Sequence, residues 1–159
     1  ARVALVLLRR LITTTPEEAS RIQGLVLSAP AWDLTEALMW DVFDARQRAE
    51  LMEQGRTVLP SDYDPAGFVI TRAFIEEGRN HLFRNRPFDP GRPIQIIQGH
   101  RDTSVPLEHA RRLAALITGG WAEITEVPDG DHRLSRPEDL ALLFSAVETM
   151  MQRSTAIPA

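Results

Sequence analysis

Asp102 and His132 are the two residues whose types and positions could support catalysis. Asp102 follows a short apolar segment, residues 94–98, which ends at Gly99, and His132 follows a second extended segment, residues 122–127. If the two segments are parallel strands of one sheet, their carboxyl ends lie at the same edge, where open α/β sheets place their sites. An aspartate beside a histidine fixes the imidazole tautomer and stabilises the imidazolium, so that the histidine can act as a general base. The sequence therefore predicts a proton-transfer pair that serves a nucleophile.

The nucleophile expected for a pair in this order is a serine on a G-x-S-x-G turn between a strand and a helix. The 159 residues contain no such motif, and none of their serines has that context. Ser104 lies beside Asp102, but a loop that presents the acid is poorly placed to present a nucleophile to the same histidine. The oxyanion-hole donors that accompany the nucleophile are missing with it. We therefore expect this sequence to be a fragment, an ordered remnant of a longer chain, or one half of a two-chain assembly.

Composition excludes several classes of function. With 43% hydrophobic residues, 25% charged residues and a formal net charge of -4, the chain is typical of a soluble globular domain and gives no reason to expect nucleic acid or a membrane as a partner. The absence of cysteine excludes disulfides, thiol catalysis and cysteine-ligated zinc. The longest apolar run, residues 3–8, is too short to span a bilayer or to form the core of a secretory signal. All the basic residues are arginine, a bias typical of GC-rich bacterial genes, so we expect a bacterial, cytoplasmic protein.

Helices and strands alternate outside the middle of the chain. Residues 1–11 are mostly apolar, which favours a buried helix, and residues 25–29 form a short apolar run that suits a parallel strand covered on both faces. After Asp102 we expect a helix over residues 107–117, an edge strand over 122–127 and a closing helix over 136–151, followed by a frayed tail. In the closing helix, the residues expected to face inward are Leu140, Leu143, Phe144 and Val147.

The middle of the chain, residues 33–92, predicts a helical insertion. Asp33, followed three residues later by Glu36, is typical of a capped helix start, and Gly55 is a suitable residue to end that helix. A second helix is expected over residues 66–83 because apolar or small residues recur there at four-residue spacing. Prolines divide the remainder into loops. We interpret the insertion as a cap.

This order of elements resembles the C-terminal half of the α/β-hydrolase fold, and the resemblance covers all of residues 1–159. The segments GxxDxxVP, residues 99–106, and DHRLSRPEDL, residues 131–140, are similar to those of small bacterial serine hydrolases and of a mitochondrial palmitoyl-protein thioesterase with acyl-glucuronide esterase activity. The resemblance implies an α/β fold: parallel strands, the sixth to eighth of the family's sheet, with flanking helices and a helical cap insertion. It also implies Asp102 as the triad acid and His132 as the base.

The activity implied by the resemblance is hydrolysis of carboxylic esters or acyl thioesters, with the catalytic serine outside this sequence. The substrate is then a small molecule, no cofactor or metal is implied, and the partner is the missing N-terminal half, in the same or a companion chain. The alternative is a catalytically inactive hydrolase-like fragment that acts as a binding module. A serine elbow upstream in the reading frame would separate these two hypotheses.

Three aromatic residues are candidates for substrate binding. Aromatic clusters fill cores and line ligand pockets alike, so both interpretations stay open at this point. The candidates are Trp32, Trp40 and Phe43.

The loop that carries His132 has further polar residues. Asp129, Asp131 and His132 could ligate a metal, but they are crowded in one loop and lack a second histidine nearby, so this interpretation is disfavoured. Arg133 could bind a substrate carboxylate, although a pair with one of the two acidic residues of the closing helix's first turn is favoured.

Overall fold

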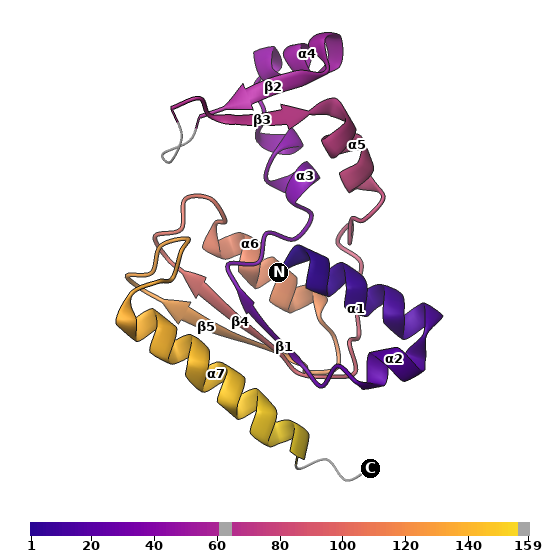
Figure 1. Ribbon diagram of the computed structural model, residues 1–159, viewed down its shortest axis with the longest axis vertical. Helices are drawn as coiled ribbons and strands as arrows, with labels where there is room; N and C mark the ends of the chain where they lie inside the picture. The colour runs from indigo at the N-terminus through magenta and orange to yellow at the C-terminus, as the bar shows by residue number, and fades with distance from the viewer. Residues whose placement is uncertain (61–64, 156–159) are drawn as a thin grey trace. The chain divides into compact units, whose positions relative to one another are not determined.

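The computed structural model describes residues 1–60 and 65–155, which form two compact units: Ala1–Trp32 with Asn85–Ala159, and Asp33–Arg84. In the first unit, a three-stranded parallel sheet has the order β1-β4-β5, with β4 (Ile94–Gly99) between β1 (Leu25–Ser28) and β5 (Ala122–Val127) (Figure 1). Ile96 and Ile97 are both buried although successive side chains of a strand point to opposite faces, so both faces of β4 are covered. The predicted parallel strands are confirmed.

Helices cover both faces of this sheet. Figure 1 shows α7 (Pro137–Thr155) on one side, and α1 (Arg2–Thr14) and α6 (Leu107–Leu116) on the other. A further short helix, α2 (Pro16–Ser20), was not expected from the sequence. α6 packs against β4 and β5, and α7 packs against β1. The first unit is therefore an α/β layer structure, in agreement with the predicted fold class.

The expected inward face of α7 is partly wrong, although Val147 lines a cavity with Val26 of β1. Phe144 is 65% exposed, Leu140 and Val147 are also exposed, and Leu143 is half-buried. Apolar residues occur all around this helix, so the sequence pattern fits more than one rotation of it. The residues that share a cavity with the sheet residues Gln95 and Thr125 are instead Leu142, Ala146 and Met150. α7 also continues to Thr155, and the rest of the expected tail lies outside the described residues.

The second unit, Asp33–Arg84, differs most from the prediction, because it contains strands as well as helices. The single helix expected up to Gly55 is broken, and a new helix begins after Asp44, whose carboxylate forms a capping box with Gln47. Gly55 does end that helix, in the left-handed conformation (φ 75°). The elements of this unit are α3 (Leu34–Ala37), the 3-10 helix η1 (Trp40–Val42), α4 (Ala45–Gln54), β2 (Arg56–Leu59), β3 (Phe68–Thr71) and α5 (Arg72–Arg79).

The expected helix over residues 66–83 is a strand followed by a shorter helix. β3 pairs with β2 in an antiparallel hairpin, and α5 begins only at Arg72. Val69, Ile70 and Thr71 are β-branched, and this preference for an extended backbone prevails over the four-residue spacing. Ile70 then packs with Phe43, Leu51 and Ile75 in the core of the unit.

Asp33 does not cap α3, contrary to the prediction. It has a left-handed backbone (φ 47°), and its carboxylate accepts hydrogen bonds from the backbone N–H groups of Phe83 at 2.6 Å and Arg84 at 2.9 Å. The first residue of the unit is thereby tied to its last two residues. The unit ends there, whereas the predicted insertion extended to residue 92; a strand-like bridge between Phe88 and Ile117 joins the intervening segment to the first unit.

We expect Asp33→Ala to lower the free energy of unfolding by about 1–3 kcal/mol, because two backbone N–H groups lose a charged acceptor. Urea denaturation measures this loss. Asp44→Ala is the matched control, since it removes an exposed helix cap whose loss costs about 1 kcal/mol. A smaller loss in Asp33→Ala than in Asp44→Ala would contradict the role assigned to Asp33.

Candidate active site

Two loops at the carboxyl ends of β4 and β5 are held together by their backbones. The strands pair in register up to Gly99 and Val127, and beyond that point Arg101 N donates to Gly130 O at 2.9 Å. A Cβ at Gly99 would collide with the backbone carbonyl of Gly130, so only glycine permits this approach. The first loop carries Asp102 and the second carries His132. The structure therefore brings together the two residues expected to form the site.

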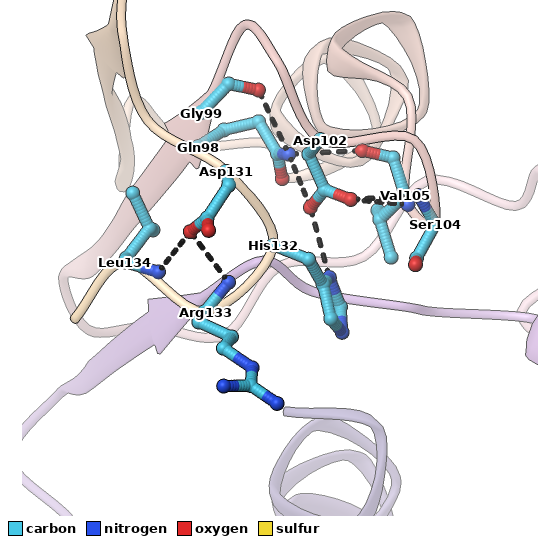
Figure 2. A network of polar contacts seen from close by, with 9 residues as sticks. All are labelled: Gln98, Gly99, Asp102, Ser104, Val105, Asp131, His132, Arg133 and Leu134. Carbon is cyan, nitrogen blue, oxygen red and sulfur yellow. Dashed lines mark hydrogen bonds and ion pairs between the residues drawn. The ribbon is translucent and has the colours of Figure 1, made fainter. Parts of the chain in front are cut away.

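The carboxylate of Asp102 accepts four hydrogen bonds (Figure 2). Its Oδ1 accepts from the backbone N–H groups of Ser104 at 2.9 Å and Val105 at 2.8 Å. Its Oδ2 lies 2.9 Å from Nδ1 of His132 and 3.0 Å from Nε2 of Gln98. The Asp102 side chain is fully buried, whereas that of His132 is 44% exposed. The carboxylate is thus fixed at both oxygens, and the imidazole is accessible.

The contact with Asp102 determines which histidine nitrogen can act as a base. A carboxylate oxygen can only accept, so Nδ1 of His132 carries the proton that it donates to Asp102. In the neutral ring, Nε2 is then the nitrogen with a free lone pair. Within the described residues, no hydrogen bond joins His132 to a serine hydroxyl. The arrangement can remove a proton from a group placed at Nε2.

The loop that carries His132 is shaped by the side chain of Asp131. Asp131 accepts from the backbone N–H groups of Arg133 and Leu134, both at 3.0 Å, which closes a tight turn around His132. Leu134 has a left-handed backbone (φ 45°) and a buried side chain, so the turn is anchored in the interior. The loop then enters α7 through Arg136, whose backbone N–H and guanidinium both donate to Asp139.

These contacts also bear on the alternatives for this loop. Arg136 makes ion pairs with Glu138 and Asp139, the two acidic residues considered as partners of Arg133. The carboxylate of Asp129 binds Arg101 at 2.6 Å. Across the described parts of the chain, no cluster of three or more histidine, aspartate or glutamate side chains is arranged to hold a metal ion.

The three aromatic candidates lie in different surroundings. Trp32 is buried in the first unit, where its Nε1 donates to the backbone carbonyl of His109 at 2.9 Å and its ring stacks on that imidazole. Phe43 is buried in the core of the second unit. Trp40, also in the second unit, is half-buried, and the guanidinium groups of Arg48 and Arg79 lie 5.4 and 4.9 Å from its ring centre.

Gln98 is the site residue that the sequence reading missed. It lies on β4, four residues before Asp102, and its amide donates to the Asp102 carboxylate. The available signal was a polar side chain in a mainly apolar strand that must be covered on both faces, although Gln95 of the same strand gives the same signal.

The chain is similar in structure to known hydrolases. A protein of Agrobacterium vitis S4 described as a hydrolase has a solved structure that matches 80% of this chain and 49% of its own length, with 40% identity and a TM-score of 0.77. The solved structure of mouse alpha/beta hydrolase domain-containing protein 10 matches 92% of this chain and 57% of its own, with 24% identity and a TM-score of 0.78. The chain has part of the α/β-hydrolase fold.

Sequence similarity leads to the same group. The mouse mitochondrial palmitoyl-protein thioesterase ABHD10 is 24% identical over 145 residues, which are 90% of this chain and 48% of the thioesterase. The human ABHD10 thioesterase is 21% identical over 143 residues. The chain spans about half the length of these curated relatives. No family model matches it. Within the described residues, no helix has both the length and the apolar character needed to cross a membrane.

Stability is expected to fall in acid because of Asp139. Hydrogen bonds from Arg136 lower the pKa of the buried Asp139 carboxyl below its ordinary value. Because the pKa of this carboxyl is lower in the folded state than in the unfolded state, its ionised form stabilises the fold at any pH above the unfolded-state pKa. This stabilisation is lost as the pH falls through the folded-state pKa. We therefore expect Asp139→Asn to have a lower melting temperature than the wild type near neutral pH. On acidification, the melting temperature of the variant should fall by less than that of the wild type.

Thermal unfolding across the acid range measures this difference. Glu138→Gln is the matched control, because Glu138 is an exposed partner of the same arginine at 3.4 Å. If Asp139→Asn and the wild type lost the same stability between neutral and acid pH, the role given to Asp139 would be contradicted.

Proposed function

We propose that this chain is the C-terminal half of a serine hydrolase that acts on carboxylic esters or acyl thioesters. The observation that carries the proposal is the hydrogen bond between Nδ1 of the accessible His132 and Oδ2 of the buried Asp102. This is the arrangement in which a carboxylate orients a histidine base toward a nucleophile. The hydrolase fold and the position of both residues after parallel strands support the same assignment.

In the proposed mechanism, Nε2 of His132 takes the proton of a serine hydroxyl while the serine oxygen attacks the substrate carbonyl. Asp102 stabilises the imidazolium that forms. His132 then protonates the departing alcohol or thiol, which leaves an acyl-serine ester. In the second half-reaction, His132 takes a proton from water, the resulting hydroxide attacks the ester, and the proton returns to the serine as the carboxylic acid is released.

We place the serine and the oxyanion-hole donors in an N-terminal half, in the same or a companion chain. Two observations support this partner: the chain spans about half of its relatives, and β1 pairs on one edge with β4 and has no strand on its other edge within the described residues. An open edge of a parallel sheet is a place for another strand. Ser104 is a poor candidate, because its backbone N–H binds the catalytic carboxylate.

The substrate class rests on the relatives and on one aromatic side chain. The mouse and human proteins are named as palmitoyl-protein thioesterases, which favours an acyl thioester among the possible esters. Of the three aromatic candidates, we propose Trp40 for contact with the acyl group because it is only half-buried, while Trp32 and Phe43 are buried, each in its own unit. We also propose a bacterial, cytoplasmic protein, since all its basic residues are arginine, a bias typical of GC-rich bacterial genes.

His132→Ala is expected to lower kcat/KM for a p-nitrophenyl ester or an acyl thioester by roughly 10⁴-fold or more, since the members of a triad act as a unit. Steady-state kinetics with the full-length protein measure this decrease in kcat/KM. His100→Ala is the matched control, because His100 also pairs with a carboxylate, that of Glu126 at 3.0 Å, outside the proposed site. Near wild-type turnover in His132→Ala would end the assignment and favour an inactive binding module.

Asp102→Asn is expected to lower kcat by about 10⁴-fold and to leave KM nearly unchanged, because an amide there favours the wrong tautomer of His132. The control is Asp131→Asn, which alters a neighbouring carboxylate that binds only backbone N–H groups. A kcat of Asp102→Asn equal to that of the wild type would show that the acid lies elsewhere.

A further inference from the structure

Gln98 is a fully buried polar residue in the central strand of the sheet. The other side chains of β4 that share its burial are isoleucines, which suit a strand covered on both faces. Burying an amide is unfavourable unless its hydrogen bonds are satisfied. Within the described residues, Nε2 of Gln98 makes such hydrogen bonds and Oε1 has no partner, so the contacts of Nε2 indicate why an amide is present at this position.

The amide nitrogen of Gln98 faces acceptors alone. Nε2 lies 3.0 Å from Oδ2 of Asp102, 2.9 Å from the backbone oxygen of Val105 and 3.3 Å from that of Gly99. Since a carboxylate and two carbonyls cannot donate, the NH₂ end of the amide must point toward them. Its two N–H bonds serve the two shorter contacts, to Asp102 and Val105.

These contacts make Gln98 part of the support of the Asp102 carboxylate (Figure 2). Oδ1 is held by two backbone N–H groups of its own loop, whereas Oδ2 is held, among the described residues, by the side chains of Gln98 and His132 alone. Gln98 and His132 thus share one oxygen. The amide donor withdraws electron density from the oxygen that receives the imidazole proton, and it prevents the carboxylate from turning away from His132.

We propose that Gln98 is a positioning residue, which fixes Oδ2 of Asp102 toward His132 and moderates the attraction of that oxygen for the imidazolium. This inference rests on the proposed function of Asp102 and His132. The bond from Gln98 to Val105 O also braces the Asp102 loop. A residue that only braced the loop would affect stability, whereas a residue that shares Oδ2 must also affect the protonation of His132.

The variant that separates these roles is Gln98→Leu, which keeps a buried side chain but has no donor. Without the amide, Oδ2 attracts the imidazolium more strongly, so the acidic limb of the pH profile of kcat/KM moves to higher pH. The looser carboxylate lowers kcat by about 10-fold to 100-fold, with KM nearly unchanged. The other charged and titratable groups of the two loops are the same in the variant: His100, Arg101, Asp129, Asp131, Arg133 and Arg136.

The test follows the His132 ring by NMR during a pH titration of the protein without substrate, together with the pH profile of kcat/KM. The matched control is Gln95→Leu, which removes an amide from the same strand that binds Thr125 Oγ1 at 2.9 Å. We expect the titration midpoint of His132 to rise by about half a pH unit or more in Gln98→Leu and to stay in place in Gln95→Leu. The same midpoint in both variants and in the wild type would overturn the inference.

A second variant of Gln98 and the choice of a measurement without substrate allow the role of Gln98 to be tested separately from folding and from activity. Gln98→Met, which is unbranched and similar in length to glutamine, replaces Gln98→Leu if that variant does not fold, with the same expected shift. The NMR titration does not depend on turnover. If the wild-type protein had no hydrolase activity, the proposed function would be contradicted, and the titration would still test whether Gln98 and His132 share Oδ2 of Asp102. Active variants with unshifted His132 titration would defeat the role of Gln98 alone.

Discussion

The in-register pairing of β4 with β5 is the constraint on which the candidate site depends. Because Gly99 lies opposite Val127, both strands end at the same level, and the backbone of the next residues continues the contact through Arg101 N and Gly130 O. A side chain at Gly99 would separate the two loops. The distance between Asp102 and His132 is therefore set by the backbone of the sheet, so side-chain flexibility contributes little to it.

The two members of the pair have opposite solvent environments, and this difference suits their roles. The buried carboxylate of Asp102 accepts four hydrogen bonds, and these donors replace the water it has lost. An imidazole that is partly exposed can exchange protons with a substrate or with water. In the proposed site, the buried Asp102 carboxylate thus orients the accessible His132 ring and stabilises its charged form.

The strands and the contact between Asp102 and His132 could be predicted because short apolar runs, a glycine and the rules for parallel sheets act locally. The insertion could not, since the capping pattern at Asp33 is overridden by bonds to Phe83 and Arg84, about fifty residues away in sequence. The rotation of α7 was ambiguous, because its apolar residues surround the helix. Gln95 and Gln98 were both visible as polar residues of a mainly apolar strand, but the partner of Gln98 depends on how the following loop turns back.

Labelling with a fluorophosphonate probe, followed by intact mass measurement and peptide mapping, tests most directly whether the pair of Asp102 and His132 serves a serine. The account predicts one adduct, on a serine outside residues 1–159 in the full-length protein or in a companion chain, because the histidine makes that hydroxyl nucleophilic. The absence of an adduct on a folded full-length protein, or an adduct whose rate of formation does not depend on His132, would contradict it.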